Sequence, residues 1–263
     1  MTLRKLAKKC IYTYCPGLSG AFPYFGTRVY FPRKSFIFDL VCEEVIYEQK
    51  LLSLIKAAAS RGGWYFDVGA NIGLMSVPIL KMCDNVHVLS LEPSPNARDF
   101  LNRTHHESPW KDRWEVVFKA VGAQTGQTPF CLSDPRFGGY DGVKDTGRVD
   151  GTGMTTVPLT TLDEEWRMLG CPQVACLKLD VEGSEIRALA GAKELIQTTK
   201  PWVFLEWYEP NSRCFGHQAQ DLLEVAREMR YQLVALPDIV EIRSQVLLML
   251  HVQSTVSFAL LPC

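Results

Sequence analysis

The stretch Tyr65–Gly73, with the sequence YFDVGANIG, constrains the fold of this chain more than any other feature. A short apolar strand runs into a turn with glycines at positions 69 and 73, and an amphipathic helix follows to about Cys83. The next apolar run, Val86–Leu91, is closed by an acid, Glu92. Strand, tight turn, helix, strand and acid in this order are typical of the βαβ half of a nucleotide-binding sheet.

The acid that precedes the glycines indicates which nucleotide this turn binds. Dinucleotide folds present Gly-x-Gly-x-x-Gly to a pyrophosphate, which the backbone amides of a helix N-terminus favour. Here the glycine spacing is Gly-x-x-x-Gly, and the acid lies where a diphosphate would arrive. A carboxylate repels phosphate but accepts hydrogen bonds from an ammonium group, which S-adenosylmethionine carries. We therefore predict that this cofactor, rather than NAD, is bound by five residues of the turn: Asp67, Gly69, Ala70, Asn71 and Gly73.

Glu92 is the predicted ribose-binding acid. It ends the second apolar strand, about 20 residues past the glycine turn, which is the distance expected for such an acid. Val121, at the end of the predicted third strand Trp114–Val121, and Asp180 complete the predicted cofactor-binding set.

The second strong motif, KLDVEGSE at residues 178–185, follows the most apolar strand of the second half, Val174–Val181. In extended backbone Asp180 and Glu182 face the same way, about 6–7 Å apart. Two carboxylates at that point provide either a general base for an acceptor hydroxyl or a site for a divalent cation, and the sequence leaves both open. Glu185 is expected in the first turn of the following helix, where its charge favours the helix dipole.

Glu206 closes a third apolar strand, Trp202–Trp207. We predict that it lines the acceptor pocket with Asp180 and Glu182, so these three acids form the candidate catalytic set. The alternative is a buried structural acid paired with the backbone or with Lys178, because an unpaired buried charge is costly.

The order of the predicted segments indicates an α/β protein with a doubly wound, mainly parallel sheet. An N-terminal β-hairpin over 24–41 and a helix over 43–60 precede the sheet, and an added strand pair is expected at 128–132 and 155–159. A helix opens at Thr161, and others span 95–106, 184–198 and 221–230. The C-terminal strands 231–236, 246–252 and 256–261 predict an antiparallel edge, with the last two as a hairpin. We expect an N-terminal arm over 1–22 and one domain over 23–263, its cofactor-binding core at about 62–210.

Composition excludes several classes of protein. The net charge of −1 gives no reason to expect nucleic acid or an anionic membrane as a partner. No apolar run reaches the ~20 residues of a membrane span. The nine cysteines are scattered without a Cys-x-x-Cys pair, so neither a zinc ribbon nor a redox dithiol is indicated, and a reduced, cytoplasmic protein is expected.

One segment, Gly138–Gly153, is rich in glycine, with six glycines in sixteen residues. Ordering such a segment is entropically costly. We predict either a mobile flap over the acceptor pocket or a plain surface loop between the added strands.

Taken together, these motifs resemble the FkbM family of S-adenosylmethionine-dependent methyltransferases over residues 40–235. The matching elements are 66–73 (FDVGANIG), 91–93 (LEP), 161–163 (TLD), 178–185 (KLDVEGSE) and 204–206 (FLE). The resemblance implies a class I, Rossmann-like methyltransferase fold and O-methylation of a hydroxyl on a sugar or natural product. It also implies that Asp67, Gly69, Asn71 and Glu92 hold the cofactor while Asp180 and Glu182 face the reacting centre.

The leading prediction is therefore an S-adenosylmethionine-dependent O-methyltransferase with a small-molecule or glycan acceptor. An NAD-dependent oxidoreductase is the weaker enzymatic alternative, because the third glycine and a proton-relay Tyr-Lys pair are missing from the sequence. A non-catalytic cofactor-binding protein is the alternative from another class. The sequence leaves open the acceptor, the acceptor atom and the oligomeric state.

Overall fold

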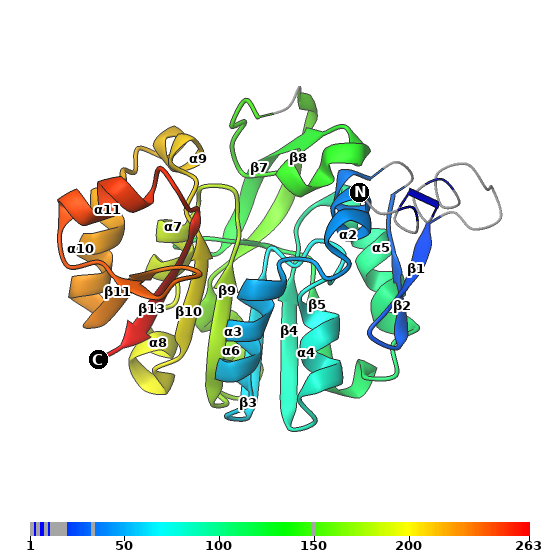
Figure 1. Cartoon of the computed structure of the whole chain (residues 1–263), viewed down its shortest axis with the longest axis horizontal. Helices are drawn as coiled ribbons and strands as arrows, with labels where there is room; N and C mark the ends of the chain where they lie inside the picture. The colour runs from blue at the N-terminus through cyan, green and yellow to red at the C-terminus, as the bar shows by residue number, and fades with distance from the viewer. Residues whose placement is uncertain (1–2, 4–5, 8–9, 11–19, 33–34, 149–150) are drawn as a thin grey trace.

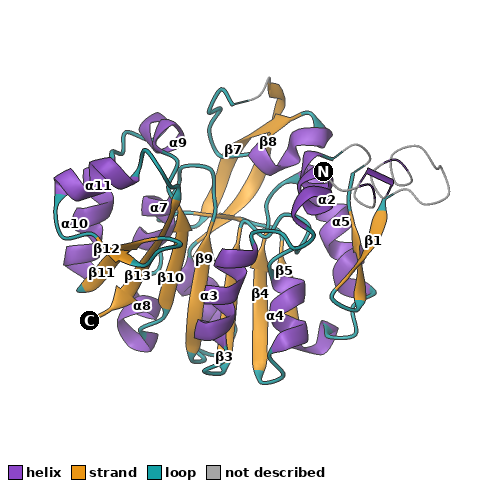
Figure 2. Ribbon diagram, in the orientation of Figure 1, coloured by secondary structure: helices purple, strands orange, loops and turns teal. Residues whose placement is uncertain are grey.

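The structure is a computed structural model that describes residues 3, 6–7, 10, 20–32, 35–148 and 151–263. A central mixed sheet carries helices on both faces (Figures 1 and 2). In spatial order its strands are β12 (Val240–Glu241), β11 (Tyr231–Ala235), β13 (Ser257–Pro262), β10 (Trp202–Glu206), β9 (Val174–Leu179), β3 (Gly63–Val68), β4 (Val86–Leu91) and β5 (Trp114–Val117). The predicted α/β fold class is confirmed.

Strand direction follows from the connections. The five strands from β10 to β5 are parallel, because helices link each to the next. The helices are α3 (Gln49–Ala59), α4 (Ser76–Met82), α5 (Pro95–His106), α6 (Leu162–Met168), α7 (Glu185–Ala190), α8 (Lys193–Thr199), α9 (Glu209–Cys214) and α10 (Ala219–Met229). The strand order reverses between β3 and β9, and ligands bind at the carboxyl ends of strands beside such a switch point.

The two faces of the sheet carry separate apolar cores, because successive strand residues point to opposite faces. On β3, Tyr65 joins the core under α3 and α4, and Phe66 joins the core under α6 and α8. On β4, Val88 joins the core under α3 and α4, and Leu89 joins the core under α6 and α8. Burial on both faces explains why these parallel strands read as continuous apolar runs in the sequence.

A small second sheet lies beyond the carboxyl ends of the central strands (Figure 1). It consists of β6 (Ala120–Val121), β8 (Gly151–Thr160) and β7 (Gly126–Ser133), in that order. The predicted strand pair at 128–132 and 155–159 is confirmed by the antiparallel pairing of β7 with β8. The predicted strand Trp114–Val121 is wrong as a single element, since the chain leaves the central sheet after β5 and β6 pairs with β8.

Two N-terminal predictions are wrong in their bounds. The hairpin comprises β1 (Ala21–Tyr24) and β2 (Thr27–Tyr30), so the expected boundary at residue 22 falls within β1. Its turn is at Phe25 and Gly26, both of which have positive φ. The predicted helix 43–60 is two helices, α2 (Phe36–Glu44) and α3, separated by Val45 and Glu48, which both have positive φ. Residues 1–2, 4–5, 8–9 and 11–19 of the predicted arm lie outside the described part of the chain.

Two C-terminal predictions also need correction. Residues 246–252 form a helix, α11 (Gln245–His251), which the Ser244 side chain caps; a short apolar run fits either a strand or a helix. The antiparallel partners of β13 are therefore β10 and β11. The predicted helix 184–198 divides into α7 and α8, because Asp163 accepts the backbone N–H groups of Glu194 and Leu195 and so starts a new helix. No helix among the described residues is long and apolar enough to cross a membrane.

Candidate active site

The glycine turn after β3 requires the residues that the sequence provides. Gly69, Asn71 and Gly73 have φ values of +81°, +48° and +89°. A Cβ at Gly69 would lie 1.8 Å from the backbone oxygen of Asp180, so only glycine fits at this position. The turn after β3 and the turn after β9 are therefore in direct backbone contact.

Asp67 lies beneath this turn and is fully buried. Its Oδ2 accepts a hydrogen bond of 2.5 Å from Ser76 Oγ, and the charge of Lys178 acts on it. Burial raises the pKa of Asp67, and Lys178 opposes that rise. The carboxylate is thus held at the floor of the cavity by the chain itself. Direct binding of a cofactor ammonium by Asp67 stays a prediction.

Glu92 lies at the carboxyl end of β4, where the sequence predicts it. Its two oxygens accept the backbone N–H groups of Asn71 at 2.8 Å and Ser94 at 2.7 Å. Burial raises the pKa of Glu92 to about 7, although both amide hydrogen bonds lower it. The amides fix the orientation of the carboxylate, which leaves its remaining lone pairs for a ligand.

A cavity with about 830 Å³ of free space, counted to its open mouth, lies over the β3–β9 switch point. Its walls include all the predicted cofactor-binding residues except Gly73: Asp67, Gly69, Ala70, Asn71, Glu92, Val121 and Asp180. Gly73 instead packs beside Leu101 and Trp114, where a Cβ would lie 3.2 Å from either side chain. Its role is to support the turn.

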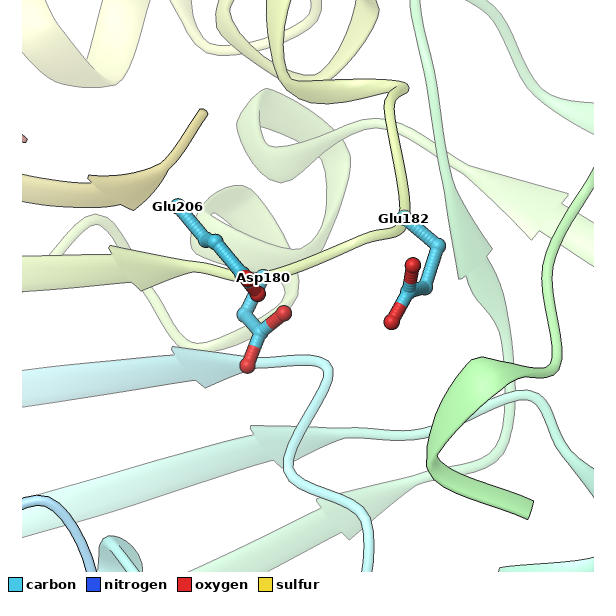
Figure 3. A group of neighbouring side chains, drawn as sticks. All are labelled: Asp180, Glu182 and Glu206. Atoms are coloured by element: carbon cyan, nitrogen blue, oxygen red, sulfur yellow. The ribbon is translucent and has the colours of Figure 1, made fainter. Parts of the chain in front are cut away.

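The three predicted catalytic acids come together beside this cavity; Asp180 and Glu182 lie on its wall, but Glu206 is not among the described residues that line it. One carboxylate oxygen from each of Asp180, Glu182 and Glu206 lies within 4.8 Å of the others. Figure 3 shows Asp180 and Glu206 side by side at the ends of β9 and β10, with Glu182 on the turn after β9. Lys178 Nζ contacts Asp180 Oδ2 at 2.8 Å, which corrects the alternative pairing of Lys178 with Glu206.

The three acids differ in their protonation. Burial opposes ionisation of Asp180, but Lys178 and a hydrogen bond with Glu206 bring the pKa of Asp180 below its usual value. Burial and the Asp180 charge raise the pKa of Glu206 well above its usual value, which favours its protonated form and a hydrogen bond from Glu206 to Asp180. Burial and the Asp180 charge also raise the pKa of Glu182, to about 8. Of these three acids, Glu182 is therefore the one whose pKa lies nearest to neutral pH.

Arg148 is a site residue that the motifs do not reveal. It reaches from the β7–β8 connection to Glu182, with 3.0 Å between Nη1 and Oε2. Its guanidinium lies over the rings of Tyr140, at 4.3 Å, and Tyr208, at 4.7 Å. Asn211 of α9 donates a second hydrogen bond to the same Glu182 oxygen, at 2.5 Å. These partners are distant in sequence and carry no local signal.

Glu185 lies in the first turn of α7, as expected, and it also stabilises the preceding turn. Its Oε1 accepts the backbone N–H groups of Val181 at 3.2 Å and Gly183 at 3.1 Å. The side chain is buried, and Glu182 between these amides has a positive φ of +52°. Glu185 thus holds the turn that presents Glu182.

The glycine-rich segment Gly138–Gly153 covers part of the cavity. Gly138, Gly139 and Asp141 lie on its wall. Asp141 accepts hydrogen bonds from Ser94 and Asn96 at the start of α5, which ties the segment to the cofactor end. Movement of the segment as a flap stays a prediction.

The chain matches one family model and is similar to several solved structures. Residues 67–233 match the family described as "Methyltransferase FkbM domain". Among solved structures, the chain is similar to methyltransferase FkbM from Methylobacillus flagellatus KT, with 19% identity over 65% of this chain and 39% of that chain, at a TM-score of 0.43. It is also similar to a TehB-like SAM-dependent methyltransferase from Corynebacterium glutamicum, with 14% identity over 85% and 91% of the two chains, at a TM-score of 0.43.

The chain thus spans about two fifths of the length of the Methylobacillus flagellatus protein. A search of curated proteins gave no match. The predicted resemblance is confirmed by the family match, which covers more than half of the chain.

Proposed function

Because the chain belongs to the FkbM methyltransferase family, whose members depend on S-adenosylmethionine, we propose that it methylates a hydroxyl group on a sugar or natural-product acceptor. The observation that carries this proposal is the position of Glu182. Its carboxylate lies on the cavity wall, with a pKa of about 8. A carboxylate of that pKa is suited to accept a hydroxyl proton near neutral pH.

The residues on the cavity wall fit the cofactor. Glu92, oriented by two backbone amides, would accept hydrogen bonds from the ribose hydroxyls. Ala70, Asn71 and Val121 would enclose the nucleoside, and Asp180 would lie near the sulfonium. When bound, S-adenosylmethionine supplies a methyl group on a positively charged sulfur, which keeps the bonding electron pair as the methyl leaves.

The chain would contribute orientation, charge and proton removal. The ion pair with Lys178 keeps Asp180 ionised, and the negative charge of Asp180 would favour the positively charged sulfur of the cofactor close to it. Glu206, protonated, holds Asp180 in place. Glu182 is held by Arg148 and Asn211. It would take the proton of the acceptor hydroxyl while the hydroxyl oxygen forms its new bond to the methyl carbon. Positioning of the two reactants supplies the rest of the rate enhancement.

Calorimetric titration with S-adenosylhomocysteine tests the cofactor half of this proposal. Glu92→Ala removes the acceptor of ribose hydrogen bonds worth about 1.5–3 kcal/mol each, so the loss of even one such bond should weaken binding about 10- to 100-fold. Glu115→Ala, an exposed acid on β5, is the matched control and should bind as the wild type does. Absence of binding to the wild type, or unchanged binding to Glu92→Ala, would contradict the proposal.

The acceptor half is tested with S-adenosylmethionine and a panel of hydroxylated glycans, amines and carboxylic acids. Mass spectrometry should detect a gain of one methyl group on a hydroxylated compound. Transfer only to amines or carboxylic acids would refute O-methylation of a hydroxyl.

A further inference from the structure

Tyr47 is a residue of the cavity wall to which the sequence motifs assign no role. It lines the same cavity as Asp180 and lies in the connection between α2 and α3. Val45 and Glu48, on either side of it, have φ values of +70° and +45°, a conformation that a β-branched valine rarely adopts. The backbone N–H of Tyr47 donates to the Tyr24 hydroxyl of the N-terminal hairpin at 3.3 Å. The surrounding structure therefore holds a strained connection that presents Tyr47 to the cavity.

The hydroxyl of Tyr47 lies in a negatively charged environment. The charges that act on it come from four carboxyl groups: Glu48, Asp180, Glu206 and Glu44. Burial and these charges raise the pKa of Tyr47 well above its usual value, so the hydroxyl stays protonated. Among the described residues, no group shares a hydrogen bond with this hydroxyl. Its oxygen can therefore accept a hydrogen bond from a positively charged ligand group, whereas an anionic group would be repelled.

The position of Tyr47 also indicates which part of the cofactor it would contact. Asp180 directly follows β9, Glu206 ends β10, and Glu92 follows β4, on the other side of β3. Glu92 would hold the ribose, so the amino-acid tail, which extends from the other side of the sulfur, would lie toward β9 and β10. That tail carries an ammonium group and a carboxylate. Because Lys178 pairs with Asp180 and offsets only that charge, the field at Tyr47 favours the ammonium group.

From this placement we propose that Tyr47 is a cofactor-binding residue, whose hydroxyl oxygen accepts a hydrogen bond from the ammonium group of the amino-acid tail of S-adenosylmethionine. The inference rests on the proposed function and names the residue that recognises the tail. Asp67, the ammonium partner predicted from the sequence, is fully buried, whereas the Tyr47 side chain is partly exposed. Asp67 would then contribute its charge, and Tyr47 would make the contact.

Two analogues of S-adenosylhomocysteine, each with one charged group of the tail, test this inference. In 5′-S-(3-aminopropyl)-5′-thioadenosine the ammonium group remains, and in 5′-S-(3-carboxypropyl)-5′-thioadenosine the carboxylate remains. We would titrate both, and S-adenosylhomocysteine itself, calorimetrically into the full chain. Tyr47→Phe removes only the hydroxyl. This variant should bind S-adenosylhomocysteine and the aminopropyl compound about tenfold more weakly than the wild type, and should bind the carboxypropyl compound equally well.

Tyr231→Phe is the matched control, because it removes a hydroxyl from a residue at the start of β11 that is not among the described residues lining the cavity. It should bind all three compounds as the wild type does. Unchanged binding of all three by Tyr47→Phe, an equal loss for all three, a loss confined to the carboxypropyl compound, or no binding of the aminopropyl compound to the wild type would overturn the inference. An equal loss would indicate a structural role. Failure of the wild type to bind S-adenosylhomocysteine would instead overturn the proposed function, so the two failures are distinguishable.

Discussion

The cofactor end and the acceptor end of the site are held together by different kinds of contact. At the cofactor end, Glu92 is oriented by backbone amides of Asn71 and Ser94, and the turn depends on backbone contact at Gly69. At the acceptor end, Glu182 is oriented mainly by the side chains of Arg148 and Asn211, from other segments. The backbone geometry therefore fixes the first end, whereas the second end depends on side chains from separate segments of the chain.

The largest effect is expected where that backbone contact is closest. Gly69→Ala would place a Cβ 1.8 Å from the Asp180 oxygen, at a φ of +81°. Both turns would have to shift, at a cost of about 3–5 kcal/mol in the free energy of unfolding. Thermal denaturation should show a much lower Tm, together with the loss of S-adenosylhomocysteine binding. Gly153→Ala, where a Cβ meets no atom within 4 Å, is the control; equal Tm values for both variants would contradict the rigid-turn interpretation.

The next effect sharpens the comparison, because it separates chemistry from cofactor binding. Glu182→Gln keeps the shape of the side chain but removes the base, so kcat should fall about 10²- to 10⁴-fold. Binding of S-adenosylhomocysteine should stay within about twofold, since Glu92 and the glycine turn are untouched. Methyl transfer to the acceptor identified by mass spectrometry measures the first quantity, and calorimetry measures the second.

Glu209→Gln, on the neighbouring helix α9, is the control for that experiment, because Glu209 pairs with Arg213 outside the cluster. Full activity of Glu182→Gln would remove this residue from the chemistry. In that case the Glu92 end and the Glu182 end of the site would both contribute only by binding the reactants.

This difference between the two ends also explains what the sequence predicts and what it does not. Gly69, Glu92 and Asp180 lie at strand ends within local motifs, so strand–turn–helix reasoning places them on the cavity wall. Arg148 and Asn211 reach Glu182 only after the chain has folded, at separations of 34 and 29 residues. No spacing rule connects residues so far apart.

Secondary structure shows the same limit. The buried parallel strands β3, β4 and β9 follow from continuous apolar runs. The run 246–252 is equally apolar but forms α11, because the Ser244 cap starts a helix there. The break between α2 and α3 depends on the positive φ of Val45 and Glu48, a conformation that neither valine nor glutamate favours. The apolar pattern therefore predicts one continuous helix through this break.

A smaller effect is expected from the ion pair at the acceptor end. Because burial and the Asp180 charge raise the pKa of Glu182 to about 8, its basic form accumulates as pH rises through that value. Asp180, Glu206, Glu185 and Arg148 are the charged or titratable groups facing it. Arg148 favours the ionised form, so Arg148→Met should move the rise in kcat to higher pH and lower the rate at pH 7 about 3- to 10-fold.

Lys144→Met is the control for the pH profile. Lys144 belongs to the same segment, but its Nζ donates to the Cys214 carbonyl oxygen at 2.7 Å and not to Glu182. Its profile should coincide with that of the wild type. An equal shift of the pH profile in both variants would mean that the whole β7–β8 connection affects the rate. The ion pair between Arg148 and Glu182 would then have no specific effect.

The smallest effect is expected from removing divalent cations. This experiment decides whether Asp180 and Glu182 act as a general base or as a site for a divalent cation, since the sequence leaves both open. Three carboxylates within 4.8 Å offer oxygen ligands of the kind that Mg²⁺ and Ca²⁺ prefer. Here, however, Lys178 neutralises Asp180, Arg148 pairs with Glu182, and Glu206 carries a proton. An added dication would have to compete with two cations of the chain and displace that proton. We therefore expect kcat to change less than about twofold on treatment with EDTA. A loss of activity that Mg²⁺ restores would contradict the role of a carboxylate base and would favour activation of the acceptor as a metal-bound alkoxide. The Glu182 end of the site would then be organised by a metal ion and not by Arg148.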